Sequence, residues 1–459
     1  MTIVVAIAAG IGTLMQSIIV PIIARVPDYL GTSAVAASWL FTGMLVAGAV
    51  SSVVFGRFAD MYGKRRLMLI ALAFLFGGSV LCAIAPGIEL MIVGRVLQGF
   101  SVACVPIAIG ILRDVVDGAA LVRGIAFVSM TTSIGGGFGA AIAGVVAEYL
   151  PWRALFWGSA GIAILAIAAV LLIVPAGRGQ PGTRFDPIGT IGLVVGLVTI
   201  LLGISNGGVW GWASAPTFGC LVGGAVVLAL WGWFESRRRE PLIDVRLLAS
   251  RPVLFTNLAS LLYGFGTYAI LVAMPQIMLL PRETGFGLGE SVLMAGIVGA
   301  PSLVFAILAP FAASWLIRRI GARWVMALAA VVLALGYAYM FVRHESNWDF
   351  VIANIVITIG LAWGFSATPA LLLEFVPREQ SAESNGVNTV IRTAGMALST
   401  AVTATILASM PITEGFGAGV LPSHAGFLTV FAVAGAGCLL VIPLIALVGR
   451  EHPERLKRS

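Results

Sequence analysis

Long apolar segments follow one another along almost the whole chain, and only short polar links separate them. Each segment has about 20 residues, the length that an α-helix needs to cross the hydrocarbon core of a bilayer. Of the 459 residues, 59% are hydrophobic and 10% are charged, whereas about 25% of the residues of a soluble domain are charged. The sequence therefore predicts an all-α integral membrane protein whose helices satisfy their own backbone hydrogen bonds in lipid.

Fourteen segments of this kind can be placed in the sequence. They lie at about residues 2–24, 38–55, 67–85, 89–112, 125–148, 154–174, 188–204, 218–233, 253–280, 291–317, 324–342, 350–373, 386–410 and 426–448. An even number of spans places both ends of the chain on the same side of the membrane.

The basic residues are distributed unevenly between the two sets of links. By these boundaries, 21 of the 27 Lys and Arg residues lie in links on one side of the membrane and four in links on the other. Links rich in Lys and Arg face the cytoplasm in multi-pass membrane proteins. We therefore predict a multi-pass protein of the plasma (cell inner) membrane with both termini in the cytoplasm.

The link between the second and third segments, residues 56–66, is short and strongly charged. We interpret it as a tight reversal in water at one face of the bilayer, made possible by its glycines. We expect its Arg57, Asp60 and Arg65 to form a charge cluster with Asp114 of a later link.

An internal repeat relates the two halves of the chain. Gly63-Lys64-Arg65 has a partner in Gly321-Ala322-Arg323, 258 positions later. We predict two six-helix bundles, at residues 1–175 and 252–449, joined by an inserted helix pair at 176–251 and followed by a polar tail at 450–459. Two related halves that face each other describe a carrier that rocks around a central cavity. We expect the charge cluster of Arg57, Asp60, Arg65 and Asp114 to stabilise the outward-open state of this carrier by pairing, and to release when the halves rock.

Several motifs resemble those of the major facilitator superfamily, and more closely its fourteen-helix drug:proton antiporter branch. The charged link at residues 56–66 resembles the loop motif of the superfamily, and Arg95 with Gln98-Gly99 resembles its fourth-helix motif. The Gly-rich segment at 135–144 and Trp152-Arg153 resemble features of the antiporter branch. The resemblance implies the major facilitator fold and proton-coupled export of hydrophobic or amphipathic compounds by alternating access.

Two departures from that branch bear on mechanism. Ala140 stands where the fifth-helix motif of the exporters has a proline, and Gln16 stands where the first helix usually carries an acid. A cation that enters a cavity of low dielectric needs a buried carboxylate to offset its desolvation, and Gln16 supplies none. We therefore expect a pocket that does not select permanent dications and that prefers neutral, amphipathic or anionic substrates.

The candidate site residues fall into two groups. For substrate binding we select Gln16, Arg95, Tyr263, Gln276, Asn388 and Arg392, and for coupling or gating we select Arg57, Asp60, Arg65, Asp114, Glu148 and Arg153. Proton coupling needs a group that titrates at working pH, and we assign it to Glu148 or Asp114.

Each candidate also has a purely structural interpretation. Arg95 could pair with helix carbonyls and hold spans together, and Arg392 could extend to the inner surface. The amide side chains could join helices rather than line a cavity. Glu148 could simply pair with Arg153 at the outer face.

Other classes of function fit the sequence less well. Four isolated cysteines and three scattered histidines suggest neither disulfides nor a metal site, and we expect no cofactor. The sequence has no P-loop motif, so we expect no nucleotide as a partner. Basic links that face the cytoplasm explain the net charge of +7, so we expect no nucleic acid either. A membrane-bound enzyme or a receptor remains as an alternative class. Within the transporter class, the alternative is an exporter or flippase of a lipid or of an endogenous anionic or neutral metabolite.

Overall fold

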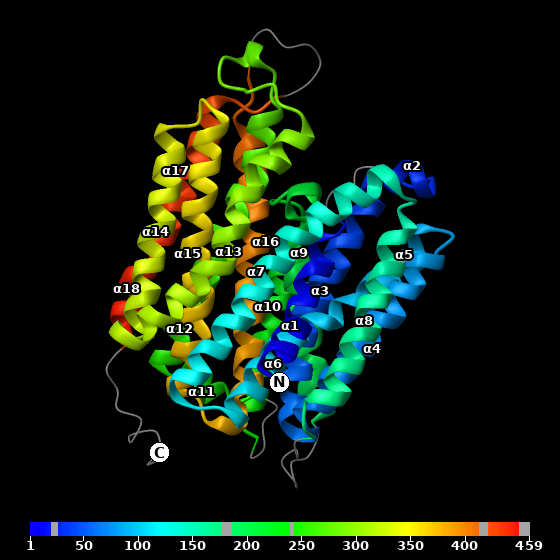
Figure 1. The fold of residues 1–459 in the computed structure, drawn as a ribbon, viewed down its shortest axis with the longest axis vertical. Coiled ribbons are helices and arrows are strands. Elements are labelled where there is room, and N and C mark those ends of the chain that lie inside the picture. The colour runs from blue at the N-terminus through cyan, green and yellow to red at the C-terminus, as the bar shows by residue number, and fades with distance from the viewer. Residues whose placement is uncertain (20–25, 177–185, 239–242, 413–420, 449–459) are drawn as a thin grey trace. The chain divides into compact units, whose positions relative to one another are not determined.

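The structure is a computed structural model that describes residues 1–19, 26–176, 186–238, 243–412 and 421–448. The predicted tail at 450–459 lies outside this part of the chain. Within the described part the regular elements are helical, apart from one isolated bridge between Pro411 and Pro422 (Figure 1).

The helices follow the predicted segments. They are α1 (Thr2–Ser17), α2 (Val26–Leu30), α3 (Ala34–Tyr62), α4 (Lys64–Ile84), α5 (Ile88–Gly99), η2 (Phe100–Ala103), α6 (Cys104–Val115), α7 (Gly118–Tyr149), α8 (Arg153–Ile173), α9 (Pro187–Trp210), α10 (Ala215–Ser236), α11 (Val245–Ala249), α12 (Arg251–Leu279), η3 (Arg282–Thr284), α13 (Val292–Ile320), α14 (Ala322–Val342), α15 (Asn347–Phe375), η4 (Arg378–Gln380), α16 (Ser381–Ser409), α17 (His424–Leu439) and α18 (Val441–Leu447).

Thirteen helical segments of the described chain are long and apolar enough to cross a membrane, and α1 is a shorter apolar helix. The predicted all-α membrane architecture is therefore confirmed. Two of the predicted spans are interrupted close to a proline. Pro106 has no N–H for the carbonyl of Val102, and a 3₁₀ segment, η2, separates α5 from α6 there. Pro443 likewise has no N–H for the carbonyl of Leu439, the residue at which α17 ends.

The repeat of 258 residues is visible in the helix boundaries themselves. Helices α3 and α13 both have 29 residues, α4 and α14 both have 21, and each pair starts and ends 258 positions apart. Ser33 and Ser291 cap the first helix of each pair by accepting a hydrogen bond from a backbone N–H three residues later. The two halves of the sequence thus encode the same local structure.

The turn that joins each of these helix pairs consists of a single glycine. Gly63 has φ 104° and Gly321 has φ 85°, values that residues with a Cβ rarely adopt. The interpretation of residues 56–66 as one charged loop is therefore wrong, because α3 continues to Tyr62 and α4 begins at Lys64. A reversal of one residue is enough here because Gly63 can take a conformation closed to other residues.

The Gly-rich helix α7 packs directly against α1. A Cβ on Gly135 would collide with the carbonyl oxygen of Gly10, and a Cβ on Gly139 would collide with the side chain of Ser17. Thr13 and Ser17 also donate hydrogen bonds to carbonyls of α7, at Thr132 and Gly135. The expected close packing of this segment is confirmed, and α7 runs from Gly118 to Tyr149 as one helix.

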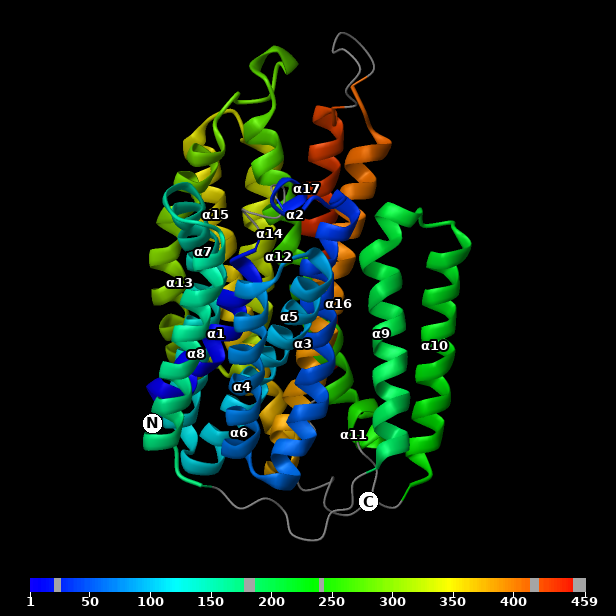
Figure 2. The same ribbon diagram turned by 90° about the vertical axis from the view of Figure 1, so that its right-hand side faces the viewer.

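The chain forms two compact units. The first contains Met1–Leu202, Val222–Ser250 and Leu372–Val390, and the second contains Gly203–Leu221, Arg251–Leu371 and Ile391–Ser459. In the first unit α4 lies beside both α5 and α8, and in the second α14 lies beside α17 (Figure 1). Helices α9 and α10 run side by side in opposite directions, with Gly196 against Leu228 (Figure 2).

Candidate functional site

A charge cluster in the first unit joins α3, α4, α6 and the start of α16. We use this name for Arg57, Asp60, Lys64, Asp114 and Glu383. Nη1 of Arg57 lies 3.1 Å from Oε2 of Glu383, and the exposed fractions of the two side chains are 12% and 3%. The pair is therefore largely withdrawn from water, where breaking an ion pair costs far more than at a surface.

The carboxylate of Asp60 binds the backbone at the start of α16. Its Oδ2 accepts a hydrogen bond of 3.1 Å from the backbone N–H of Glu383. This N–H belongs to the first turn of α16, where the amides lack helical partners and the helix dipole favours a negative charge. Asp60 thus acts toward α16 as an anion at a helix N-terminus.

Lys64 completes the cluster by contacting two carboxylates. Its Nζ lies 3.4 Å from Asp60 and 2.8 Å from Asp114. Arg65, which we expected in this cluster, instead donates a hydrogen bond of 2.6 Å to the carbonyl of Leu171 in α8. Lys64 begins α4 directly after the Gly63 turn, four positions after Asp60 near the end of α3, and this short separation was the signal available in the sequence.

Glu383 and Arg113 were not selected from the sequence, although both lie at the centre of these contacts. Oε1 of Glu383 also accepts from the backbone N–H of Asp244, at 3.3 Å. Arg113 donates to the carbonyls of Leu373, Val376 and Pro377 at 2.7–3.0 Å, and to Oγ of Ser381 at 3.0 Å. No local pattern marks either residue, because their partners lie more than a hundred positions away in the sequence.

Close backbone contacts accompany the charged ones. A Cβ on Gly56 of α3 would collide with the carbonyl of Ala382, and a Cβ on Gly386 of α16 would collide with the carbonyl of Ser52. Arg378 also forms an ion pair with Asp117. The segment Leu372–Val390 is thus held to α3 and α6 by ion pairs, carbonyl contacts and two glycines, within one compact unit.

Arg95 lies at the meeting point of α1, α3, α4 and α5 and has an exposed fraction of 0%. It donates to the carbonyls of Leu40 and Met15, at 3.2 and 3.0 Å, and to Oε1 of Gln98 at 2.7 Å. Gln98 in turn donates to Ser79 of α4. These contacts agree with the structural interpretation, in which Arg95 holds spans together. Gln16, which follows Met15 on α1, is half-buried.

The second unit contains three of the other candidates for substrate binding. The hydroxyl of Tyr263 donates to the carbonyl of Met326, so this ring is a buried contact between α12 and α14. Gln276 is exposed on α12. The guanidinium carbon of Arg392 lies 4.8 Å from the ring centre of Phe365, and Nε of Arg392 has no hydrogen-bond partner in the described part of the chain. Asn388, in the first unit, is buried on α16.

Arg153 and Glu148, the two candidates close to the turn between α7 and α8, are described only in part. Arg153 donates to the carbonyl of Ala85 at 2.8 Å, and its guanidinium lies 4.5 Å from the Trp152 ring centre. Glu148 belongs to α7, but its side chain lies outside what the structure describes, so its role remains a prediction.

Two of the three histidines, scattered in the sequence, meet in the second unit. The Nε2 atoms of His344 and His424 lie 2.6 Å apart, close to the ring of Phe286. All four cysteines are free. In the part of the chain that the structure describes, no group of three or more His, Cys, Asp or Glu side chains could hold a metal ion.

Relatives with known names match much of the chain. Multidrug resistance protein Stp of Mycobacterium tuberculosis (strain CDC 1551 / Oshkosh) is 25% identical over 413 residues, which cover 88% of this chain and 75% of that protein. Cephamycin export protein CmcT of Amycolatopsis lactamdurans is 30% identical over 314 residues, 67% of this chain and 63% of that protein. An uncharacterized MFS-type transporter of Mycobacterium tuberculosis (strain ATCC 25618 / H37Rv) is 25% identical over 376 residues, 82% of this chain. The chain matches only 54% of the length of that last relative.

Two solved structures share the fold. The human organic anion transporter MFSD10 superposes with a TM-score of 0.66 at 14% identity, covering 97% of this chain and 98% of its own. The proton:xylose symporter XylE superposes with a TM-score of 0.64 at 13% identity, covering 96% and 94%. A sequence profile for the Major Facilitator Superfamily matches residues 5–400 and 256–459. This match covers well over half of the residues, and the chain belongs to the Major Facilitator Superfamily.

Proposed function

We propose that the chain is a secondary active exporter of small amphipathic molecules that works by alternating access. Membership of the superfamily supports transport, and the relatives named as multidrug resistance and cephamycin export proteins support export. Both termini lie in the cytoplasm in this proposal, as the distribution of basic residues predicts.

The observation that carries the proposal is the way in which Leu372–Val390 is held to α3 and α6. The contacts are mainly ion pairs and hydrogen bonds to backbone carbonyls, such as Arg57 with Glu383 and Arg113 with Leu373. Contacts of this kind can be exchanged for water when a segment moves, whereas a large apolar seal would resist opening. The charge cluster is therefore suited to be a gate that closes and reopens in each transport cycle.

Protons drive the export in this proposal. Asp114 is a carboxylate exposed to water that shares Lys64 with the buried Asp60, so a change of charge at Asp114 alters the partners of the whole cluster. Asp114 and Glu148 remain our two candidates for the coupling acid. A proton on either carboxylate of the Lys64 pair would weaken its hold on the ammonium group.

The substrate class follows from the charges inside the spans. Gln16 on the first helix carries no charge. Arg392 on α16, in contrast, places a cation against the ring of Phe365 on α15. We propose that neutral or anionic amphiphiles are preferred over permanent dications. This half-buried cation within a span also favours one alternative, the export or flipping of an anionic metabolite or lipid.

Proteoliposomes with an imposed pH gradient test the proposal. Purified protein is reconstituted, and the transport of a neutral, an anionic and a dicationic fluorescent amphiphile is followed with and without a protonophore. Saturable movement of the neutral or anionic dye that stops when the gradient collapses supports the proposal. Dye binding without movement supports a receptor, and movement that ignores the gradient contradicts proton coupling.

A further inference from the structure

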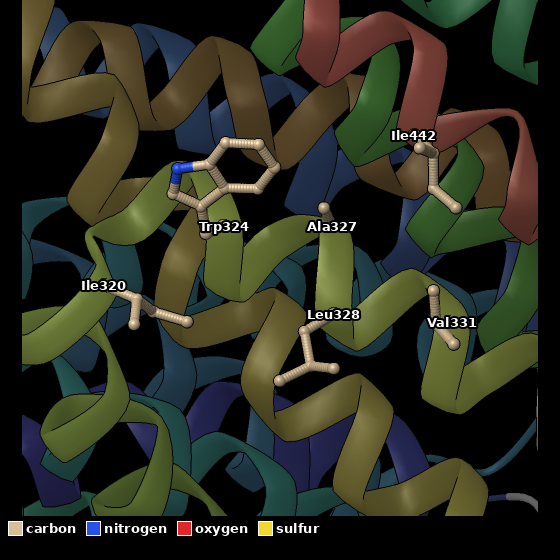
Figure 3. Close-up of a pocket in the computed structure, with 6 residues that line it drawn as sticks. All are labelled: Ile320, Trp324, Ala327, Leu328, Val331 and Ile442. Carbon is tan, nitrogen blue, oxygen red and sulfur yellow. The ribbon is translucent and has the colours of Figure 1, made fainter.

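An apolar groove of about 640 Å³ lies on the surface of the second unit. Ile320, Trp324, Ala327, Leu328, Val331 and Ile442 line it (Figure 3). The four residues of α14 are spaced at i, i+3, i+4 and i+7, so they form one stripe along the helix. Ile320 comes from the end of α13 and Ile442 from α18, whose turns border this stripe. The volume lies within the range of about 300–1,000 Å³ that small-molecule sites have.

The groove exists because a small side chain stands between large ones. Ala327 occupies the middle of the stripe, whereas Trp324 is 58% exposed, Leu328 36% and Ile442 37%. The counterpart of Ala327 in the first repeat, 258 positions earlier, is Leu69, and the counterpart of Trp324 is Arg66. At the floor of the groove, the second repeat thus has a methyl group where the first repeat has a larger side chain.

Two residues that line the groove directly follow arginines in the sequence: Ile320 follows Arg319, and Trp324 follows Arg323. Arg318, Arg319 and Arg323 flank the turn at Gly321, and Arg319 lies with its guanidinium 4.6 Å from the Trp315 ring centre. Arg323 donates to the carbonyl of Ala446 at 2.9 Å. Exposed tryptophans and arginines at the end of a spanning helix mark the level of the lipid headgroups. The apolar stripe thus runs into the bilayer from a positively charged edge.

We propose that this groove binds an anionic phospholipid, with one acyl chain along Ala327 and the phosphate between Arg319 and Arg323. The apolar stripe matches a hydrocarbon chain, and the arginines match an anionic headgroup, to which each basic residue near a membrane surface adds attraction. Arginine also binds phosphate in a bidentate geometry. This assignment does not depend on the proposed export function, since it concerns the surface that faces lipid.

The test is native mass spectrometry of the purified full chain titrated with phosphatidylglycerol or with phosphatidylcholine of the same acyl chains. We expect wild type to retain phosphatidylglycerol in preference. The variants Arg319→Gln and Arg323→Gln should each lower that preference about fivefold. Arg246→Gln, which removes an equal charge from the exposed face of α11, is the matched control and should leave most of the preference intact.

A second pair of variants tests the groove itself. Ala327→Leu copies the residue of the first repeat and should abolish retention of the lipid, whereas Ala338→Leu, an exposed position three turns along α14, should not. The melting temperature of each variant without added lipid shows whether it is folded. Equal retention of the two lipids by wild type, or unchanged retention by a folded Ala327→Leu variant, would overturn the proposal.

Discussion

The guanidinium of Arg57 in α3 lies 3.1 Å from the carboxylate of Glu383 in α16, although 326 positions separate the two residues in the sequence. The same turn of α16 presents its backbone N–H at Glu383 to Asp60. Arg57 and Asp60, three positions apart on α3, therefore bind the side chain and the backbone N–H of the same residue, Glu383. Because the side chains of Arg57 and Glu383 are in direct contact, we expect their contributions to stability to be coupled.

Replacement of Glu383 tests this coupling. Glu383→Gln leaves the Arg57 guanidinium without its ion pair in a place that is only 12% exposed. Removing one partner of a buried pair costs about 3–5 kcal/mol, so we expect a clear loss of thermal stability in detergent.

In a double-mutant cycle of Glu383→Gln with Arg57→Gln, the second substitution should cost much less stability than it does alone. Glu379→Gln, at an exposed position just before α16, is the matched control and should change stability by about 0.5 kcal/mol or less. Additive effects of the Arg57 and Glu383 substitutions would contradict the coupling.

The fold could be predicted further than the site could. Apolar runs of spanning length and the repeat at Gly63 and Gly321 are local properties of the sequence, and the helices follow them. The pairing of Arg57 with Glu383 depends on which helices pack together, and hydropathy carries no information about that. Arg65 illustrates the limit, since it is adjacent to Lys64 but points to a carbonyl of α8 rather than to the charge cluster.

Replacement of the two candidate coupling acids separates binding from proton-driven transport. We expect Asp114→Asn or Glu148→Gln to leave the affinity for a neutral amphiphile unchanged and to abolish transport driven by a pH gradient, because an amide cannot carry the proton. Glu283→Gln is the matched control, since Glu283 is an exposed carboxylate in η3 and belongs neither to the charge cluster nor to the contacts of Leu372–Val390. Binding is measured by fluorescence titration and transport in proteoliposomes. Wild-type transport by both amide variants would show that the coupling group lies elsewhere.

Arg392 and Arg95 are both cations within spans, and their substitutions should have different consequences. The guanidinium of Arg392 lies against the ring of Phe365, and its Nε has no hydrogen-bond partner in the part of the chain that the structure describes. Arg392→Gln should therefore weaken the binding of an anionic amphiphile about tenfold and leave a neutral one unaffected. Arg392→Lys keeps the charge and should retain most of the affinity.

Arg95 is fully buried and already donates to Leu40, Met15 and Gln98, and only its Nη2 has no hydrogen-bond partner in the described part of the chain. We therefore expect Arg95→Gln to lower the melting temperature with no selective effect on anions. A selective loss of anion binding in a folded Arg95→Gln variant would reverse the two assignments.

Labelling of single cysteines tests the predicted orientation, on which the direction of export depends. Cys82, Cys104 and Cys438 are buried and Cys220 is half-buried, so Cys220→Ala gives a background of low reactivity. Arg66→Cys at the exposed start of α4 and Lys457→Cys in the terminal tail should both be protected from an impermeant maleimide in intact cells. Arg343→Cys should react, because Arg343 directly follows the last residue of α14, in a link that the predicted topology places outside the cell. Its side chain is 65% exposed.

The uneven distribution of Lys and Arg predicts this pattern, because basic links remain in the cytoplasm during insertion. If the cysteines at positions 66 and 457 reacted from opposite sides of the membrane, the chain would have an odd number of spans, and two matching six-helix halves with an inserted pair could not be maintained.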